Sequence, residues 1–360
     1  MTARRITLGD GLVTSEQGLG GMVFSSVYGP ADERDSLLTI NTAIDAGITL
    51  LDTADLYGSG GNEELFAGIL KTRRDEVQIA TKFGILSDPG PGGPKAQGDP
   101  AYVRTSLEAS LRRLGTDAVD LYYYHRVDPR VPIEETTGAL AELVGEGKIR
   151  HIGLSEVTAG ELVRAAAVHP IAAVQSEWSV FSRDVEDRLL PAAAGLGVGF
   201  VAYSPLGRGF LTGAVGSAGD LSAGDLRRRF PRFGPRELSR NVPLLQIINR
   251  TAAAEGITAA QLILAWVHHS GRRLGLAAVP IPGTRRAGRI LENLSAAALD
   301  LSPAAVAALD GLSARVAGDR AADPLYISRG RELLEPDQDA ATANAATAVN
   351  AATAEGASRA

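Results

Sequence analysis

Short apolar segments recur along the chain, and most are followed by a segment with the periodicity of an amphipathic helix. The apolar segments have the length and composition of strands, and they span residues 18–22, 49–53, 77–83, 119–125, 150–155, 172–177, 200–204 and 276–281. The helical segments between them include residues 33–46, 62–70, 102–114, 133–146 and 159–168. Strands that alternate with helices predict right-handed βαβ crossovers and a parallel sheet.

Eight such units close most naturally into a (β/α)8 TIM barrel. An open doubly wound sheet has the same local pattern and is the competing fold. Nearly every predicted strand ends in, or leads directly into, a polar residue or glycine: Asp52, Lys82, His125, Ser155, Gln175, Ser204 and Gly283. A barrel brings all eight strand ends around one mouth, where barrel enzymes hold their catalytic residues. We therefore predict an α/β fold of the TIM-barrel type.

Some segments lie outside this alternation. Residues 6–13 predict a β-hairpin, because an Asp-Gly turn separates two apolar runs. Long loops are predicted over residues 86–100 and 215–242. The second loop contains a basic cluster and is a candidate lid or specificity element. From residue 336 the chain is rich in Ala, Thr and Asn without aromatic residues. We expect one barrel domain over residues 1–335 and a disordered tail over residues 336–360.

The charge and the cysteine content narrow the possible functions. The formal net charge of −6 argues for a soluble protein and against a broad nucleic-acid-binding surface. The chain has no cysteine, which excludes disulfides, thiolate zinc sites and a cysteine nucleophile. The first residues lack the apolar run of a secretory signal, and no run of about 18 apolar residues predicts a membrane span. We expect a cytoplasmic protein whose partner is a small molecule.

Four residues at or near the ends of successive predicted strands carry the candidate chemistry: Asp52, Tyr57, Lys82 and His125. Each alone has an ordinary structural explanation, but together they are the residue types that reduction of a carbonyl by hydride requires. A tyrosine, with an ordinary pKa of about 10, becomes a better acid when a lysine ammonium lowers that pKa. A buried aspartate keeps the lysine charged, and a histidine orients the substrate oxygen by a hydrogen bond.

The chain resembles the aldo-keto reductase superfamily from Arg5 to Leu312. The resemblance rests on the ordered blocks LLDTADLYG, GNEEL, IATKFG, SLRRLGTDAVDLYYYHRVD, KIRHIGLSE, VQSEWSVFSRD, VAYSPLGRGFLTG and IPGTRRAGRILEN. It implies an NADP-dependent oxidoreductase that transfers a hydride from NADPH to an aldehyde or ketone. It also implies that Tyr57 is the general acid and that Asp52, Lys82 and His125 complete a catalytic tetrad.

The same resemblance implies a set of NADPH-binding residues. Ser155 and Gln175 match positions that hold the nicotinamide carboxamide, and Tyr203 matches an aromatic that stacks on the nicotinamide ring. The other implied positions are Gly20, Gly21, Met22, Asp52, Ser204, Pro205, Leu206, Gly207, Arg208, Ile281, Gly283, Thr284, Arg285, Arg289, Glu292 and Asn293. Arg285 and Arg289 share one face if their segment is helical, and two guanidiniums favour a phosphate and hence NADPH over NADH.

Three positions depart from the pattern of many relatives. Glu156 stands where many have Asn, and a carboxylate cannot donate a hydrogen bond to the carboxamide carbonyl. Gly283 stands where some have a lysine for the 2′-phosphate, so that charge has to come from Arg285 or Arg289. Gly84 stands where some place a bulky aromatic over the substrate, which predicts a wider or differently lined pocket.

Other functions fit the sequence less well. The segment GLGGM is not the GxGxxG fingerprint of a Rossmann dehydrogenase. A metal site is not expected, because His268 and His269 are adjacent on a predicted helix and His151 and His169 lack partners at ligand spacing. A barrel lyase with Lys82 as a Schiff base is disfavoured by the tyrosine and histidine beside it. The main alternative is an NADPH-binding accessory subunit of the same fold, which an intact tetrad also permits.

Overall fold

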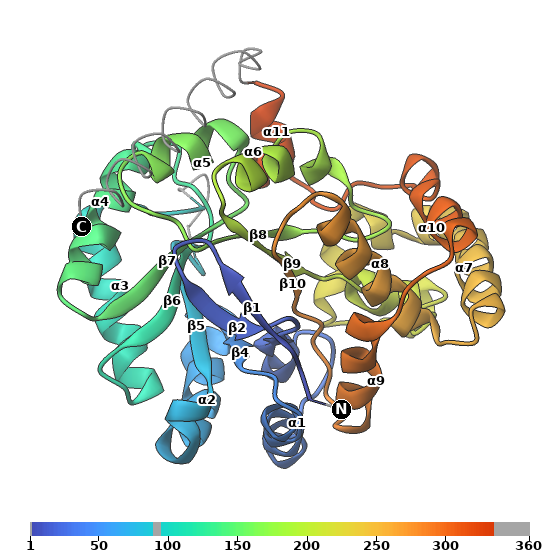
Figure 1. The fold of residues 1–360 in the computed structure, drawn as a ribbon, viewed down its shortest axis with the longest axis horizontal. Coiled ribbons are helices and arrows are strands. Elements are labelled where there is room, and N and C mark those ends of the chain that lie inside the picture. The colour runs from blue at the N-terminus through green and yellow to red at the C-terminus, as the bar shows by residue number, and fades with distance from the viewer. Residues whose placement is uncertain (1, 89–94, 335–360) are drawn as a thin grey trace.

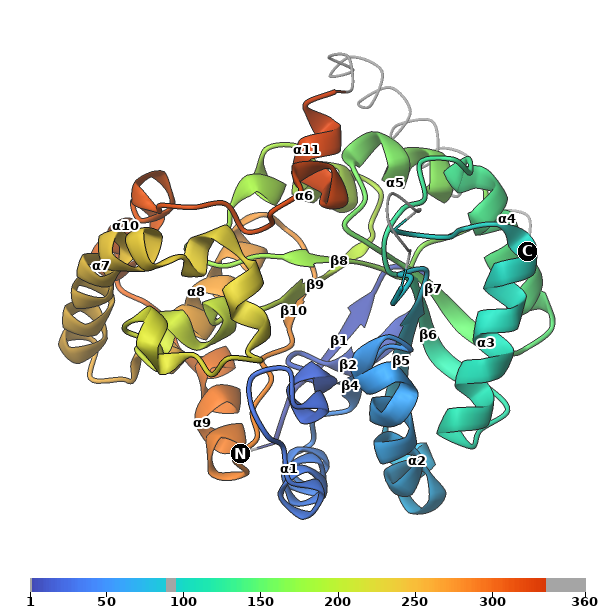
Figure 2. The same ribbon diagram turned by 180° about the vertical axis from the view of Figure 1, so that it is seen from behind.

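The eight predicted strands form one parallel sheet that curls into a barrel (Figures 1 and 2). The computed structural model describes residues 2–88 and 95–334. The strands, which lie in the order β10-β9-β8-β7-β6-β5-β4-β3, are β3 Leu19–Gly20, β4 Leu50–Asp52, β5 Gln78–Phe83, β6 Val119–Tyr124, β7 Ile149–Ser155, β8 Ala173–Glu177, β9 Gly199–Tyr203 and β10 Ala278–Pro280. The backbone N–H of Gly18 donates to the carbonyl of Pro280 at 3.0 Å, so the first and last strands are neighbours. The fold is therefore the predicted (β/α)8 barrel and not an open sheet.

Helices surround the barrel. They are α1 Glu33–Asp45, α2 Gly61–Arg73, α3 Pro100–Leu114, α4 Ile133–Gly145, α5 Ala159–Ala166, α6 Leu189–Gly195, α7 Pro235–Ala254, α8 Ala259–Arg273, α9 Gly288–Ser295, α10 Pro303–Asp310 and α11 Ser328–Glu332. The first five agree with the predicted helical segments to within a few residues. Helices α3 and α5 begin at side-chain caps, Asp99 and Thr158, which accept hydrogen bonds from the backbone of the first turn.

Two predicted boundaries were wrong. The loop predicted over residues 215–242 ends earlier, because helix α7 begins at Pro235; proline is accommodated in the first turn of a helix, where its missing N–H has no partner to lose. The strand predicted over residues 18–22 is limited to Leu19–Gly20, and Gly21–Ser25 form a 3₁₀ turn instead. The tail expected over residues 336–360 and part of the loop expected over residues 86–100 lie outside the described residues.

The predicted hairpin closes the amino-terminal end of the barrel, where Figure 1 shows it in front of the strands. Its strands are β1 Arg5–Leu8 and β2 Leu12–Ser15, and they pair antiparallel with Leu8 opposite Leu12. Both leucines are buried and belong to the apolar cluster that fills the barrel interior. Because this end is plugged, a ligand can enter the barrel only from the carboxyl ends of the strands.

Alternation along the strands determines which residues reach that open end. The lower interior layer is apolar and is formed by Leu50, Ala80, Leu121, Ala173, Val201 and Val279. In a strand, residues two apart point to the same side. The next interior positions are therefore Asp52, Lys82, Tyr123, Gln175, Tyr203 and Ile281. The barrel thus carries its polar interior residues in one layer above an apolar floor.

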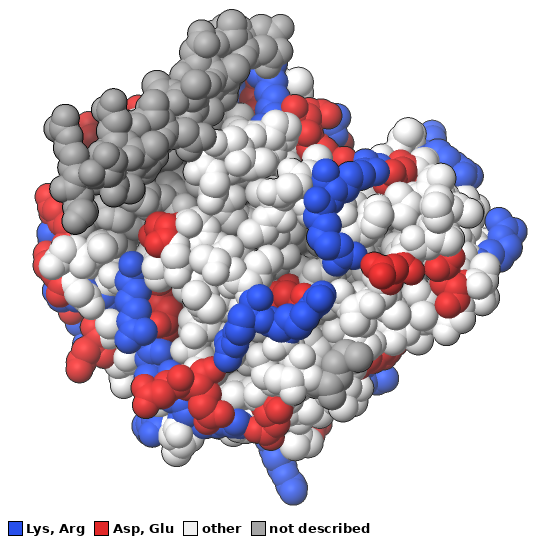
Figure 3. Space-filling model, viewed as in Figure 1, with Lys and Arg blue, Asp and Glu red and all other residues white. Residues whose placement is uncertain are grey.

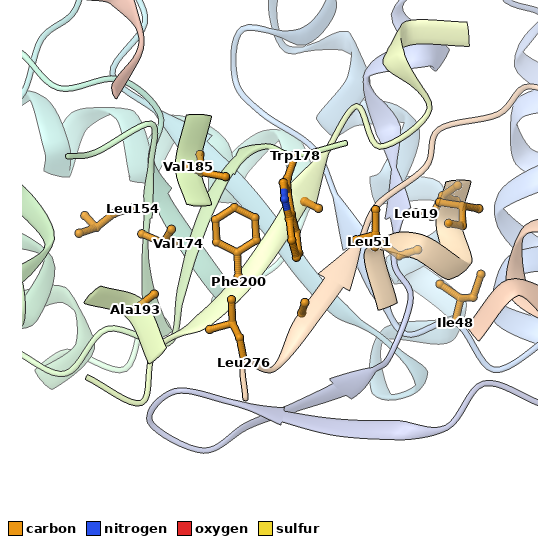
Figure 4. Close-up of a cluster of buried hydrophobic side chains, with 14 of the residues drawn as sticks. Leu19, Ile48, Leu51, Leu154, Val174, Trp178, Val185, Ala193, Phe200 and Leu276 are labelled. Carbon is orange, nitrogen blue, oxygen red and sulfur yellow. The ribbon is translucent and has the colours of Figure 1, made fainter. Parts of the chain in front are cut away.

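A second apolar core lies between the sheet and the helices. Figure 4 shows Trp178, Phe200, Val174, Val185 and Ala193 within it, from β8, β9, α6 and the segment between β8 and α6. The indole of Trp178 packs edge-on against the ring of Phe200, with ring centroids 5.6 Å apart. Burial of apolar surface in this core stabilises the packing of the helices on the barrel, by roughly 25 cal/mol per Å² of surface buried.

The molecular surface has a mixed charge. On the face in Figure 3, Lys and Arg side chains are interspersed with Asp and Glu, and neither sign forms a continuous field. Within residues 2–88 and 95–334, no helix is both long enough and apolar enough to cross a membrane.

We expect Gly153→Ala to destabilise the protein by about 1–3 kcal/mol, the usual cost of overpacking a core. A Cβ atom at Gly153 would lie 2.4 Å from the ring of Tyr123. Urea unfolding measures the effect. The matched control is Gly138→Ala in α4, where nothing lies within 4 Å of an added Cβ. That change should stabilise by about 0.5–1 kcal/mol, because glycine is unfavourable inside a helix. Equal stabilities for the two variants would contradict this account of the barrel interior.

Candidate active site

A cavity of about 740 Å³ opens at the carboxyl ends of the barrel strands. Nearly all of the residues that the sequence assigned to the site line it: Gly20, Met22, Asp52, Tyr57, His125, Ser155, Gln175, Tyr203, Ser204, Pro205, Leu206, Arg208, Ile281, Gly283, Thr284, Arg285, Arg289, Glu292 and Asn293. Lys82, Gly21 and Gly207 do not line it. Lys82 lies behind Tyr57, and an added Cβ at Gly21 would meet Phe66 and the carbonyl of Asp52 rather than open space.

Lys82 is completely buried and is held by three oxygen atoms. Its ammonium forms an ion pair with Asp52 Oδ1, donates to the carbonyl of Thr53 at 2.8 Å and lies 3.5 Å from the hydroxyl of Tyr57. Burial acts to lower the pKa of Lys82, but the charges of Asp52 and Tyr57 and the hydrogen bonds to both together outweigh it, and the pKa is raised. The lysine is therefore a permanent positive charge directly behind the tyrosine hydroxyl.

Asp52 connects this ion pair to the barrel strand on the opposite side. Its second carboxylate oxygen accepts a hydrogen bond of 2.8 Å from the amide of Gln175. Both oxygens of the buried carboxylate are thus satisfied, which a buried charge requires. The amide oxygen of Gln175 stays available to accept a hydrogen bond from a ligand.

Tyr57 keeps its proton at neutral pH. Burial raises the pKa of its hydroxyl, and Lys82 offsets part of that effect without reversing it. Lys82 thus acts on the pKa of Tyr57 in the expected direction, but desolvation of the phenolate exceeds the attraction of one ammonium. A protonated hydroxyl at the cavity wall is the form that can donate to an oxygen.

His125 lies against Tyr57, with the two rings edge to face and their centroids 6.0 Å apart. Burial, together with the charges of Arg126 and Lys82, holds the pKa of His125 well below its ordinary value. Its Nδ1 has no hydrogen-bond partner among the described residues. A neutral imidazole beside the tyrosine can donate one hydrogen bond to a substrate oxygen without carrying charge.

One end of the cavity has groups that match a ligand with an amide and a flat ring. These groups belong to Ser155, Gln175 and Tyr203. Ser155 accepts from Arg126 at 3.2 Å, which leaves its own hydroxyl proton free to donate. With the free oxygen of Gln175, the pair offers one donor and one acceptor, as a carboxamide requires. The ring of Tyr203 lines the cavity and its hydroxyl is tied back to Glu156 at 2.8 Å. The residues at this end therefore fit a nicotinamide.

Glu156 forms contacts within the protein and does not line the cavity. Its carboxylate accepts from both terminal nitrogens of Arg320 at 2.8 and 2.9 Å and from the backbone N–H of Ser328 at 3.1 Å. Burial acts to raise the pKa of Glu156, but the charges of Arg320 and Arg126 hold it well below its ordinary value. The residue thus fastens the segment before and within α11 across the barrel mouth.

The other end of the cavity is rich in arginine. Arg285 forms its hydrogen bonds within the protein: its guanidinium donates to the carbonyls of Gly29 and Pro30 at 2.9 and 2.5 Å. It lies before helix α9 rather than on a helical face with Arg289. Arg286 and Arg289 line the cavity, and in the described part of the chain neither guanidinium has a carboxylate within ion-pair distance. Two unpaired guanidiniums at one end fit a phosphate group.

The loop after β9 supplies the wall between these ends. Ser204 and Arg208 have φ angles of 48° and 55°, a backbone conformation that non-glycine residues adopt only where the surroundings impose it. Arg227, from the segment predicted as a long loop, donates to the carbonyl of Arg208 at 3.1 Å. Leu226, Arg227 and Phe230 of that segment line the cavity.

Sequence reasoning missed several lining residues. Arg126 and Arg286 each adjoin a residue that the sequence had assigned to the site, and this adjacency was the only sequence signal for their position. Tyr326 and Ile327 come from the carboxyl-terminal segment, and no local pattern could have placed them at the barrel mouth. Gly84 does not line the cavity; an added Cβ there would lie 3.0 Å from the ring of Tyr124. Within the described ranges, no three His, Asp or Glu side chains are grouped as metal ligands.

Comparison with known proteins agrees with this geometry. A thermostable aldo-keto reductase crystallised with the inhibitor epalrestat is 30% identical, with a TM-score of 0.66; the match covers 86% of this chain and 99% of that one. The glycerol dehydrogenase of Gluconobacter oxydans is 27% identical, with a TM-score of 0.75 and coverage of 88% and 96%. The profile of the Aldo/keto reductase family matches residues 17–314. The chain thus belongs to the aldo/keto reductase family of oxidoreductases.

Proposed function

We propose that the protein reduces an aldehyde or ketone with NADPH and that Tyr57 supplies the proton. The observation that carries this proposal is the fully buried ammonium of Lys82, held between Asp52 and the hydroxyl of Tyr57 at the cavity wall. Burial of a charged group is energetically costly unless partners compensate the charge. Here its third contact is a tyrosine hydroxyl that faces the cavity.

NADPH supplies the hydride when it is bound. Ser155, Gln175 and Tyr203 would hold its nicotinamide end, and Arg286 and Arg289 its phosphate-bearing end. The chain's own residues then handle the proton. As negative charge develops on the carbonyl oxygen, Tyr57 donates its proton to that atom, and Lys82 stabilises the phenolate that remains. His125 donates a hydrogen bond to the same oxygen and fixes its direction. The carbonyl gains one hydride and one proton and becomes an alcohol.

The unpaired arginines favour NADPH over NADH. Arg285 already serves three backbone carbonyls, which include that of Tyr28 at 3.4 Å. Arg286 and Arg289 have no carboxylate partner within the described ranges, and the 2′-phosphate is the only anionic group that distinguishes the two cofactors. A guanidinium recognises a phosphate through two parallel hydrogen bonds.

Tyr57→Phe should lower kcat/KM for an aromatic aldehyde by about 100-fold or more, because a general acid contributes at least that factor. NADPH oxidation followed at 340 nm measures the rate, and quenching of protein fluorescence measures NADPH binding, which should not change. Tyr102→Phe is the matched control; Tyr102 lies on α3 outside the cavity wall. Wild-type turnover by Tyr57→Phe would show that another group is the acid.

The pH profile should follow from the two shifted pKa values. His125 has a lowered pKa and is neutral above its ordinary value of about 6.5. Tyr57 has a raised pKa and loses its proton only above about 10. kcat/KM for reduction of a neutral aldehyde should therefore be level from about pH 6.5 to 9 and fall as pH rises further. A limb centred between pH 6.5 and 8 would contradict the proposed states of both residues.

Arg289→Ala should weaken NADPH binding by at least about 10-fold and leave NADH binding within a factor of about two, since a hydrogen bond to a charged group contributes roughly 1.5–3 kcal/mol. Titration of each cofactor at low ionic strength measures the ratio. Arg250→Ala on the exposed side of α7 is the control. Equal losses for the two cofactors would show that Arg289 does not contact the 2′-phosphate.

A further inference from the structure

Arg126 follows His125 directly, lines the cavity and is held on three sides. One terminal nitrogen donates to the carbonyl of His125 at 2.6 Å and to the hydroxyl of Ser155 at 3.2 Å. The guanidinium carbon lies 5.1 Å from the ring centroid of Tyr326, so a cation–π contact covers it on that side. The position of this positive charge is therefore fixed by the protein.

The charge of Arg126 has no carboxylate partner. The other deeply placed arginines of the cavity wall are paired: Arg208 with Glu177 at 3.4 Å, Arg227 with Asp225 at 2.7 Å and Arg320 with Glu156 at 2.8 Å. Among residues 2–88 and 95–334, no carboxylate lies within 4.0 Å of the Arg126 guanidinium, and its Nε is buried without an acceptor. Glu156 is near enough to act on Arg126, but its oxygens already bind Arg320, Tyr203 and Ser328.

The unpaired guanidinium belongs to the reacting end of the cavity. It adjoins His125 in the chain, and its charge acts on both His125 and Tyr57. An anion bound by Arg126 would therefore lie at the end of the cavity that holds Tyr57 and His125. A guanidinium that is partly removed from water and unpaired is unfavourable, and a ligand carboxylate would supply the missing partner.

We propose that Arg126 determines substrate specificity by binding a carboxylate, so that the preferred substrates are aldehydes or ketones that also carry a carboxylate group. This inference rests on the proposed function and adds the substrate class to it. The planar fork of the guanidinium matches a carboxylate. Tyr326 forms the apolar wall beside the fork.

The test compares substrates that differ only in charge. The pairs are 4-formylbenzoate with its methyl ester and 3-formylbenzoate with its methyl ester. The wild-type protein should prefer at least one acid over its ester by about 10-fold or more in kcat/KM, the usual effect of a charge-assisted pair. Arg126→Met should remove this preference, mainly by raising KM for the acid, and should lower kcat/KM for the ester much less than kcat/KM for the acid. Arg126→Lys should restore part of the preference, because it keeps the charge without the fork. Arg250→Met is the matched control.

Two outcomes would overturn the proposal. The wild-type protein could show no preference for either acid, or Arg126→Met could lower kcat/KM for acid and ester equally, as expected if Arg126 only supports His125 and Ser155. Calorimetric binding of 4-formylbenzoate to the protein with NADP⁺ separates this proposal from the proposed function. Binding that Arg126→Met abolishes, with no turnover of any aldehyde, would support Arg126 and refute the reductase. Turnover of the esters without charge preference would do the opposite.

Discussion

The ion pair between Lys82 and Asp52 is the constraint on which the rest of the site depends. A lysine that is completely removed from water keeps its charge only because Asp52 and the carbonyl of Thr53 surround it. Replacement of either Lys82 or Asp52 by a neutral residue would leave an uncompensated buried charge, which typically lowers the stability by about 3–5 kcal/mol. The same pair fixes Gln175 through the second oxygen of Asp52 and Tyr57 through the ammonium. Three barrel strands and one loop are thus aligned by a single buried pair of charges.

The barrel makes this arrangement possible through its register. Asp52 and Lys82 point inward because they lie two residues beyond Leu50 and Ala80, which form the apolar floor. Pairing of Lys82 with Tyr123 brings a further interior side chain to the same level, and the ammonium lies 5.8 Å from that ring. A shift of one residue in any of these strands would turn the polar side chain toward the helices and a side chain from the outer face of the sheet into the cavity. The apolar core outside the sheet therefore protects the chemistry inside it.

Pairing of charges also explains how the cavity wall is divided. Each of Arg208, Arg227 and Arg320 pairs with a carboxylate, and these arginines hold loops and the carboxyl-terminal segment in place. Arg126 at one end and Arg286 and Arg289 at the other have no such partner in the described part of the protein. An unpaired guanidinium in a concave, partly desolvated site is a position where a ligand can contribute the missing negative charge. Arginines that hold the fold are thus distinguished by their carboxylate partners from arginines that lack such a partner among the described residues, although their sequence contexts look alike.

Strand periodicity and family-like blocks were sufficient to predict the barrel, its hairpin and the positions of Tyr57 and the three residues around it, because these features are local. Each polar strand end follows a short apolar run, and the closed parallel fold brings such ends together. Contacts between segments distant in the chain were decided only by the tertiary structure. Glu156 is an unexplained substitution in the sequence, but Arg320 and Ser328, more than a hundred residues away, make it an anchor. Arg285 and Arg289 look equivalent in the sequence, yet Arg285 donates to carbonyls of a distant loop, whereas Arg289 has no carboxylate partner in the part of the chain that the structure describes. A sequence states which charges exist, whereas their partners, and hence their roles, depend on which segments the fold makes neighbours.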